Sequence, residues 1–300
     1  MAPRLSVIIT AFREPETVGP AIDAFILQLS EDAEVLVVCP DPQTIAVVDQ
    51  YTARHPIVRH IADPQRGKPT AVNAGLEAAQ GDLVILSDGD VRVDNHALEP
   101  LLAPFDDPKV GAVSGHPISV SPRSTMLGYW SHLLTNAIHR LRLAREQATQ
   151  AGKPRFLLCS GYLFAFRSRL IDSVPEDALA EDAVISHRIA QQGAHIRYAP
   201  EAYVYVRYPT TYSDWLRQKV RSAGGYAQSY IRQSPYRMRS AWLEARNAWI
   251  ALQYPSSFRE FLWTLLLFAA RLHVWFVVLI KVRLLRRPFN AIWQRVESTK

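Results

Sequence analysis

Two aspartates flank a glycine directly after an apolar run, in the sequence Asp88-Gly89-Asp90. The run itself, residues 83–86 (LVIL), has the composition of a buried strand in a parallel sheet. The carboxyl ends of such strands form the edge at which open α/β folds bind ligands. Carboxylates at this edge suit Mg²⁺ or Mn²⁺, which combine them with phosphate oxygens. The turn therefore predicts a metal-diphosphate site, with an ordinary Asp/Gly turn as the alternative.

A basic turn and a helix precede this strand. Residues 66–69 (RGKP) open the segment, and small and apolar residues then recur at helical spacing until Gly81. The stretch 66–94 resembles the nucleotide-sugar half of family-2 glycosyltransferases, whose pattern is a GK-x-x-A-x-N-x-G helix, a strand and a D-x-D ending. The residues that match are Gly67, Lys68, Ala71, Asn73, Gly75, Asp88 and Asp90. Several spaced matches are far more specific than a D-x-D alone.

The resemblance covers about residues 4–226 and implies a GT-A fold, which is an α/β architecture with a mostly parallel, Rossmann-like sheet and helices on both faces. It also implies sugar transfer with inversion from a nucleotide-sugar donor, a UDP-sugar rather than a GDP-sugar, with Mg²⁺ or Mn²⁺ as cofactor. In this scheme Asp90 binds the metal, Asp88 holds the ribose or a metal-bound water, and Lys68 supplies positive charge to the diphosphate.

The rhythm of strands and helices supports this fold from the residues themselves. Residues 5–10 (LSVIIT), 34–39 (EVLVVC) and 110–114 (VGAVS) are typical of buried strands, and helices are expected over 15–29 and 45–55. Such alternation predicts a mostly parallel sheet.

No repeat or low-complexity linker interrupts the chain. One catalytic domain is therefore expected over 1–235, with a donor half over about 1–115 and an acceptor half over 116–235. C-terminal membrane-associated helices are expected over 236–300.

Two segments are assigned to the nucleotide side by the resemblance. In the family the end of the first strand reads A-Y-N-E and touches the nucleotide, so Ala11 and Glu14 are carried over to that role. Glu14 could equally be a first-turn acid favoured by the helix dipole. The family's base-reading turn is replaced by Cys39-Pro40-Asp41, and Asp41 is expected to fill that role one position late. The departure leaves uracil and guanine open as the base.

Glu181 and Asp182 precede an expected helix over 183–192. Acidic residues at a helix N-terminus are common caps, and chemistry alone favours that interpretation. The resemblance changes the weighting, because an E-D pair before an L-x-x-R-I helix is the family's base motif. It makes Asp182 the general base and places Glu181 beside the acceptor and diphosphate. Asp182 is expected to be ionised, since the helix N-terminus favours negative charge.

Two further elements complete the acceptor half. Residues 156–166 (FLLCSGYLFAF) predict a buried strand, and in the family its S-G element, with Gly161, lies below the donor sugar. Gln218 and Arg221 resemble a Q-x-x-R-W element and share a helical face, so that both address the diphosphate pocket. Ser222 replaces the tryptophan, which removes an acceptor-stacking platform and weakens the case for a processive polymerase.

A long helix is expected over 126–150. Its apolar residues recur at helical spacing, and its other side is basic. That side carries His139, Arg140, Arg142 and Arg145. We interpret it as the solvated face of an amphipathic helix.

The last third of the chain indicates a membrane. Residues 240–254 are typical of an interfacial helix, and 261–282 are long enough to span, although Arg271 and His273 lie in the middle. The N-terminus has no signal-peptide pattern, so attachment to the cytoplasmic face of the cell membrane is expected. Spanning and in-plane placement stay open, and a buried helix of a soluble protein is the alternative.

Composition bounds the partners. The net charge is +6, but the basic residues gather in the C-terminal third beside tryptophans and apolar runs. A membrane surface or an anionic donor explains this distribution better than nucleic acid does. Cys39 and Cys159 lack the spacing of a zinc site. The expected partners are therefore a nucleotide-sugar, a glycan or lipid-linked acceptor and membrane lipids, with no nucleic acid.

Two other functions are weighed against this one. A sugar-phosphate nucleotidyltransferase shares a similar sheet, but it needs a glycine-rich loop after the first strand, and residues 10–14 contain no glycine. A catalytically silent membrane scaffold of the same fold would agree with the departures at Pro40 and Ser222.

Overall fold

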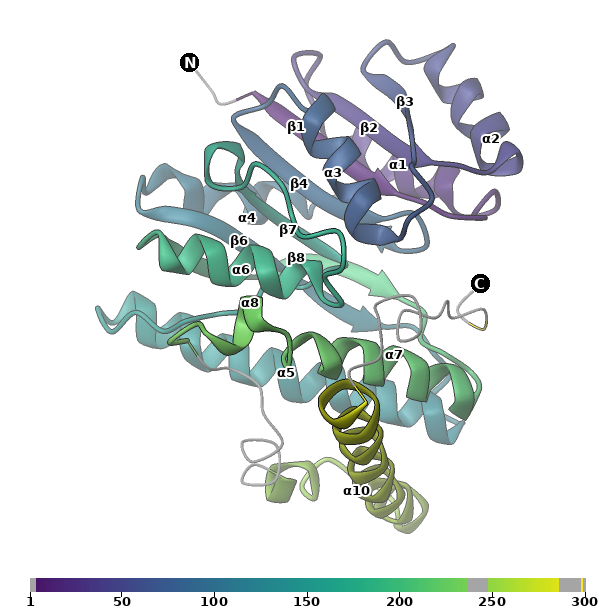
Figure 1. Ribbon diagram of the computed structural model, residues 1–300, viewed down its shortest axis with the longest axis vertical. Helices are drawn as coiled ribbons and strands as arrows, with labels where there is room; N and C mark the ends of the chain where they lie inside the picture. The colour runs from purple at the N-terminus through teal and green to yellow at the C-terminus, as the bar shows by residue number, and fades with distance from the viewer. Residues whose placement is uncertain (1–3, 237–247, 286–297, 299–300) are drawn as a thin grey trace.

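The computed structural model describes residues 4–236, 248–285 and 298. Its centre is an eight-stranded sheet in the order β3-β2-β1-β4-β7-β6-β8-β5, with helices on both faces (Figure 1). The strands are β1 Leu5–Thr10, β2 Glu34–Cys39, β3 Val58–Ala62, β4 Leu83–Asp88, β5 Arg92–Val93, β6 Val110–Ser119, β7 Leu163–Arg167 and β8 His195–Val206. The helices are α1 Val18–Ile26, α2 Pro42–Thr52, α3 Lys68–Ala78, α4 Leu98–Leu102, α5 Met126–Gln150, α6 Glu181–Gln191, α7 Tyr212–Gly225, α8 Ser229–Arg232 and α10 Phe258–Val278.

Strands β3, β2, β1 and β4 are parallel to one another, which places the ends of β1 and β4 side by side. Strand β7 runs antiparallel between β4 and β6, and β5 runs antiparallel to β8. Strands β6 and β8 are again parallel. The predicted mostly parallel α/β sheet is confirmed, and the antiparallel β7 brings residues of the acceptor half next to β4.

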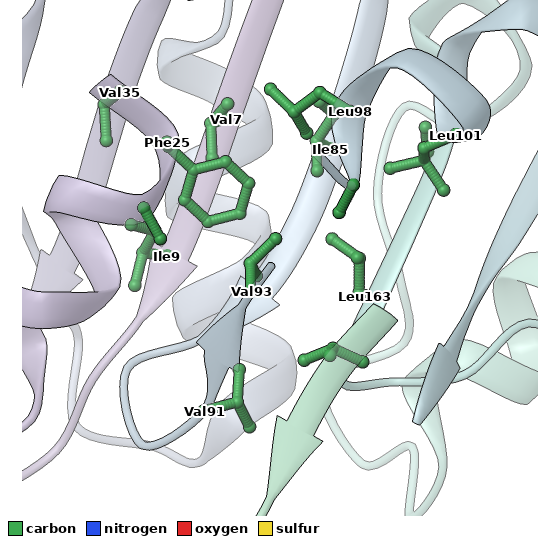
Figure 2. Packing of buried hydrophobic residues seen from close by; sticks show 14 of the residues in the cluster. Val7, Ile9, Phe25, Val35, Ile85, Val91, Val93, Leu98, Leu101 and Leu163 are labelled. Carbon is green, nitrogen blue, oxygen red and sulfur yellow. The ribbon is translucent and has the colours of Figure 1, made fainter. Parts of the chain in front are cut away.

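Alternate side chains of the strands pack into two apolar layers, one on each face of the sheet. In β1, Val7 and Ile9 pack with Phe25 of α1 on one face (Figure 2), whereas Ile8 faces α3 on the other. A Cβ atom at Gly75 would lie 2.5 Å from Ile8 Cγ2, so a glycine is needed for α3 to pack this closely on β1. The family-like glycine of this helix therefore sets the position of α3 and of the residues at its start.

The predicted strand over 156–166 is wrong in its first half, because β7 begins only at Leu163. The preceding N–H groups donate to side chains and not to a neighbouring strand. Cys159 N donates to Ser186 Oγ at 3.0 Å, and Ser160 N donates to Ser114 Oγ at 3.0 Å. The segment before Leu163 is thus a buried loop held from several sides.

The predicted solvated face of the long helix α5 is also wrong in part. Arg142 is 6% exposed and Glu146 is 3% exposed. The Glu146 carboxylate can be buried because Arg197 of β8 donates to its Oε1, at 2.7 Å from Nε, and Tyr198 N donates to its Oε2 at 2.9 Å. Partners supplied by β8, which the sequence of the helix does not reveal, turn this side inward. Arg140 remains exposed.

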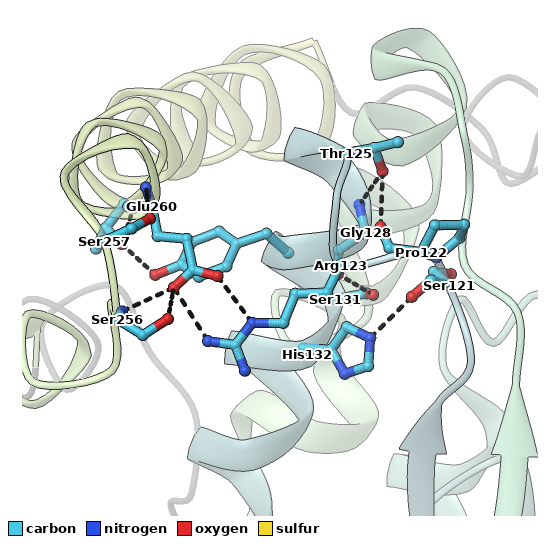
Figure 3. A network of polar contacts seen from close by, with 12 residues as sticks. Ser121, Pro122, Arg123, Thr125, Gly128, Ser131, His132, Ser256, Ser257 and Glu260 are labelled. Carbon is cyan, nitrogen blue, oxygen red and sulfur yellow. Dashed lines mark hydrogen bonds and ion pairs between the residues drawn. The ribbon is translucent and has the colours of Figure 1, made fainter.

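Helix α10 packs along α5 and α7 (Figure 1). Its buried positions recur every three to four residues and are Glu260, Thr264, Leu267, Ala270, Val274 and Val278. Arg123 donates from Nε and Nη2 to the Glu260 carboxylate at 2.8 and 3.0 Å, and Ser256 N also donates to it (Figure 3). One side of α10 is therefore fixed to α5, α7 and Arg123 along its whole length.

The segment Phe258–Lys281 is long and apolar enough to cross a membrane, with a mean hydropathy of 2.0. Most of the expected interfacial helix over 240–254 lies outside the described residues, which resume at 248. The division at residue 235 stays a prediction.

Candidate active site

The Asp88-Gly89-Asp90 turn lies at the carboxyl edge of the sheet, where β1 and β4 end together. Thr10 Oγ1 donates to Asp88 Oδ1 at 3.2 Å, and Gly89 N donates to Thr10 O at 2.9 Å. A Cβ atom at Gly89 would lie 2.7 Å from both Ala11 Cβ and Glu14 Oε2. The missing side chain thus lets the predicted nucleotide-side residues Ala11 and Glu14 lie directly against the acidic turn.

Lys68 joins the two halves of the site. Its Nζ lies 2.6 Å from Asp88 Oδ1 and 2.9 Å from Glu181 Oε1. It is the first residue of α3, after Gly67, whose φ of 112° is in the region that favours glycine. Burial disfavours the charged lysine, but Asp88 and Glu181 raise its pKa well above the usual value. Burial likewise disfavours ionised Glu181, but Lys68 lowers the Glu181 pKa, so the cluster stays charged.

Asp182 lies beside this cluster at the start of α6, which begins at Glu181. Its Oδ2 accepts from Gly161 N at 3.1 Å, and its Oδ1 accepts from Ala183 N at 2.8 Å. The helix N-cap is Ala180, so Asp182 does not occupy the capping position. Its carboxylate instead connects the helix to the loop before β7.

The pKa of Asp182 is raised to about 6 by burial and then by the neighbouring Glu181 charge. The helix N-terminus was expected to hold this carboxyl in its charged form, but burial outweighs that effect. At neutral pH a group with this pKa is still mostly ionised, and it is closer to the pH at which a general base works best.

Tyr162 is a site residue that the sequence reasoning missed. Its hydroxyl lies 3.5 Å from Gln218 Nε2, and its carbonyl accepts from Ser87 Oγ at 3.0 Å. Burial raises its pKa, and the charges of Asp88 and Asp90 raise it further. Tyr162 therefore lies between the acidic turn and α7. The sequence could have indicated this role, because Tyr162 directly follows the Ser160-Gly161 element. The apolar residues around it instead predicted a buried core position.

Helix α7 brings Gln218 and Arg221 to this place. The charge of Arg221 lowers the pKa of both Glu181 and Tyr162. Gln218 Oε1 is buried and accepts no hydrogen bond. The structure thus gathers most of the predicted site residues, from both halves of the chain, around one edge of the sheet.

Asp41 has a local structural role in addition to any contact with a ligand. Its Oδ1 accepts from Thr44 N at 3.0 Å as the N-cap of α2, and its Oδ2 accepts from Arg13 N at 2.6 Å. Thr44 Oγ1 in turn accepts from Glu14 N at 2.8 Å. Burial would raise the Asp41 pKa, but these hydrogen bonds lower it. The carboxylate therefore orders the loop that carries Ala11 and Glu14, and its base-reading role stays a prediction.

Within the described residues, no cluster of three or more His, Cys, Asp or Glu side chains could hold a metal alone. The acidic turn still fits Mg²⁺ or Mn²⁺, because these ions are commonly held by one or two carboxylates with substrate phosphates and water. Asp88 Oδ1 is bound by Lys68 Nζ and Thr10 Oγ1. The metal role of Asp90 stays a prediction.

A family model described as glycosyltransferase like family 2 matches residues 3–225. The chain belongs to glycosyltransferase family 2. It is 26% identical over 238 residues to the probable glycosyltransferase YdaM of Bacillus subtilis, an alignment that covers 74% of this chain and 55% of the relative. It is 24% identical over 234 residues to a poly-β-1,6-N-acetyl-D-glucosamine synthase of Staphylococcus aureus, covering 76% and 56%. The chain thus spans little more than half the length of these relatives. The predicted enzyme class is confirmed.

Solved structures are similar in fold. The mannosyltransferase PcManGT from Pyrobaculum calidifontis, in complex with GDP-Man and Mn²⁺, aligns with a TM-score of 0.61 and 20% identity over 97% of this chain and 83% of its own. Glucosyl-3-phosphoglycerate synthase from Mycobacterium tuberculosis, in complex with Mn²⁺, UDP and glucosyl-3-phosphoglycerate, aligns with a TM-score of 0.53 and 17% identity over 79% and 82%. The predicted GT-A fold is confirmed.

Proposed function

We propose that this protein transfers a sugar, with inversion, from a UDP-sugar to a hydroxyl group of a glycan or lipid-linked acceptor at the cytoplasmic face of the membrane. One observation carries the proposal. Lys68 binds Asp88 of the acidic turn and Glu181, and Glu181 is followed by the partly buried carboxylate of Asp182. A diphosphate-binding turn and a candidate base are thereby held a short distance apart, as a direct displacement requires.

In the proposed reaction Asp182 accepts the proton of the attacking hydroxyl group. Its two hydrogen bonds, from Gly161 N and Ala183 N, orient the carboxylate, and its pKa of about 6 leaves it ionised at neutral pH. Lys68 and Arg221 offset negative charge that develops on the diphosphate. A direct displacement inverts the anomeric carbon and needs no covalent nucleophile on the protein.

The implied metal fits the acidic turn. Asp90, with Asp88 next to it, would hold Mg²⁺ or Mn²⁺ together with the diphosphate. When bound, such an ion stabilises negative charge on the departing diphosphate. Lys68 Nζ already lies 2.6 Å from Asp88 Oδ1, so this part of the site is arranged by the protein itself.

The similar structures differ in their nucleotide, since PcManGT is complexed with GDP-Man and the mycobacterial synthase with UDP. A panel of radiolabelled UDP-glucose, UDP-N-acetylglucosamine, UDP-galactose and GDP-mannose, assayed with Mn²⁺ and with EDTA, tests the donor and the metal together. Release of UDP supports glycosyl transfer. Formation of sugar 1-phosphate and a nucleoside triphosphate, only when pyrophosphate is added, would instead indicate a nucleotidyltransferase, and no turnover of any donor would indicate a silent scaffold.

Asp90→Asn should abolish metal-dependent turnover of the donor and leave the melting temperature near that of the wild type. The amide keeps the size of the side chain but removes the negative charge that the cation requires. Asp172→Asn, at an exposed position, is the matched control and should behave like the wild type. Full turnover by folded Asp90→Asn protein would remove the metal role from this residue.

The free side of α10 supports the membrane part of the proposal. Leu266, Leu272 and Phe276 are 51%, 72% and 62% exposed, while the opposite side is fixed to α5 and α7. A helix bound along its whole length to the body would lose these contacts by crossing a bilayer. We therefore propose that α10 lies in the plane of the membrane, with these side chains among the lipids.

Flotation with anionic liposomes tests this surface. The wild type should float, and the double variant Leu272→Glu/Phe276→Glu should stay in the soluble fraction, because a charge on this face opposes insertion. Leu27→Glu is the control. Leu27 is also 72% exposed, but it is the C-cap residue of α1 and does not belong to α10. Equal flotation of the wild type and the double variant would contradict an in-plane α10.

A further inference from the structure

Arg142 of α5 is a buried cation without a carboxylate partner among the described residues. It is 6% exposed, and its Nε is enclosed without a hydrogen-bond partner. Arginine cannot shed its proton in a protein. A buried charge that lacks a partner is strongly unfavourable, so this position calls for an anion.

The nearest acidic residue along the helix, Glu146, already has other hydrogen-bond partners. Glu146, one turn after Arg142, accepts from Arg197 Nε at 2.7 Å and from Tyr198 N at 2.9 Å. What Arg142 does contact is the ring of Tyr198, with its Cζ 5.9 Å from the ring centroid. A cation-π contact at this distance is weak and leaves the five N–H donors of the guanidinium available to a ligand.

Backbone pairing connects this place to the base. Tyr198 of β8 is the partner of Ser114 in β6, and Ser114 Oγ accepts from Ser160 N at 3.0 Å. The next N–H in the chain, that of Gly161, donates to Asp182. Arg142 is therefore connected, through Tyr198 and Ser114, to the loop that holds Asp182. Its charge also reaches the base, since it lowers the Asp182 pKa against the effect of burial.

The groups around Arg142 do not neutralise it. His139, one turn earlier on α5, bonds the Tyr198 hydroxyl at 2.7 Å and stacks on His116 with ring centroids 4.1 Å apart. Burial lowers the pKa of both histidines, which favours their neutral forms. Tyr208, whose pKa the Arg142 charge also influences, is a neutral neighbour that packs edge-on against Tyr162 at 5.9 Å.

We propose that Arg142 binds an oxyanion of the acceptor substrate, a phosphate or a carboxylate, on the Asp182 side of the site. The inference rests on the proposed role of Asp182, because the acceptor must lie where its hydroxyl reaches the base. A planar guanidinium recognises either oxyanion through paired N–H donors. An acceptor with such a group would neutralise the charge of the Arg142 guanidinium, for which the described residues supply no ion pair.

Calorimetry can measure this binding without relying on turnover. UDP and Mn²⁺ first saturate the donor site, so that added anions cannot bind at Lys68 or Arg221. Inorganic phosphate and glucuronate are then titrated separately into the full-length protein. Binding of phosphate indicates a phosphorylated acceptor, and binding of glucuronate indicates an acidic sugar.

Arg142→Gln should weaken binding of the preferred anion at least tenfold and leave UDP affinity unchanged. Arg140→Gln, at an exposed position on the same helix, should bind like the wild type. Arg142→Lys keeps the charge but not the paired donors, so it should bind with intermediate affinity, and it decides the question if the glutamine variant does not fold.

Equal anion affinity in the wild type and a folded Arg142 variant would overturn the anion site, as would failure of both anions to bind wild-type protein that binds UDP normally. Failure of UDP and Mn²⁺ to bind would instead count against the proposed function. The two failures are therefore distinguishable.

Discussion

The two sides of the site differ in how their charges are compensated. On the donor side Lys68 lies within 2.6 Å of Asp88 and 2.9 Å of Glu181, so the cluster is paired before any ligand arrives. On the acceptor side Arg142 is buried and Asp182 is partly buried, and neither forms an ion pair within the described residues. Burial raises the Asp182 pKa. The difference indicates that the donor side is preorganised by the protein, whereas the acceptor side is completed by its substrate.

The largest expected effect comes from removing the donor-side cation. Lys68→Met would leave the Asp88 and Glu181 carboxylates close together without the charge that they share. Unfolding free energy should fall by on the order of 3 kcal/mol, the usual cost of breaking a buried pair from one side. Transfer should fall about 10²–10³-fold, as for loss of one electrostatic stabiliser. Chemical denaturation and the donor assay measure the two effects.

Arg66→Met is the matched control for this variant. Arg66 lies two residues earlier and pairs with Glu176 at 3.0 Å, but both side chains are more than half exposed. An exposed pair contributes about 1 kcal/mol or less. If both variants lose the same stability, the preorganised donor side is not supported.

A smaller effect is expected where Arg123 attaches α10 to the rest of the fold. Arg123→Gln removes the bidentate pair with Glu260 and should destabilise the attachment by about 1–3 kcal/mol. Faster hydrogen exchange in α10 is the measurement. Arg259→Gln, at an exposed position of the same helix, is the control. Unchanged exchange in the Arg123 variant would show that the apolar contacts alone fix α10.

The Arg123–Glu260 pair also predicts a pH dependence. Hydrogen bonds from Arg123 lower the Glu260 pKa to about 2, below its usual value of 4.5. A depressed carboxyl pKa contributes stability that is present above the usual pKa and is lost as pH falls toward 2. The Arg123→Gln variant should therefore lose less stability than the wild type when both are acidified below pH 4.5.

The smallest expected effect is a gradual change of transfer rate and stability as pH falls and Asp182 is protonated. Since the Asp182 pKa is raised to about 6, transfer should fall about tenfold per pH unit below 6, as the base is protonated. Stability should change in the opposite direction, because a raised carboxyl pKa costs stability above about 6 and that cost disappears as pH falls. Denaturation of the wild type and Asp182→Asn across pH 4–8 measures this term. A constant difference between them would contradict the raised pKa.

The sequence predicted the donor half well because its signals are local. The strands at 5–10 and 34–39 match β1 and β2 residue for residue, since an apolar run that ends at a turn determines both ends of a buried strand. The order of motifs also assigned Lys68, Asp88 and Glu181 to one nucleotide-sugar site, although the contacts of Lys68 with both carboxylates were not predicted. The family pattern supplied that conclusion, because nothing local connects residues so far apart.

The failures come from long-range partners. The side of α5 that carries Arg142 was predicted to be solvated, but Arg142 and Glu146 are buried there, and Arg197 and the Tyr198 backbone of β8 bind the Glu146 carboxylate. The segment before β7 was predicted to be a strand because it is apolar. It is a loop because its N–H groups donate to the side chains of Ser186 and Ser114, which no local pattern reveals. Local hydrophobic periodicity cannot show which polar groups a distant strand will satisfy.

The central claim is that Asp182 is the base, and one Asp182→Asn sample tests it most directly. Its amide oxygen can still accept from Gly161 N or Ala183 N, so stability should fall by no more than about 1 kcal/mol. UDP affinity should be nearly unchanged, because Lys68 and Asp90 remain. Transfer should fall about 10²–10⁴-fold, since an amide cannot accept the proton at neutral pH. Near-normal transfer in this folded, UDP-binding variant would contradict the account and direct the search to Glu181.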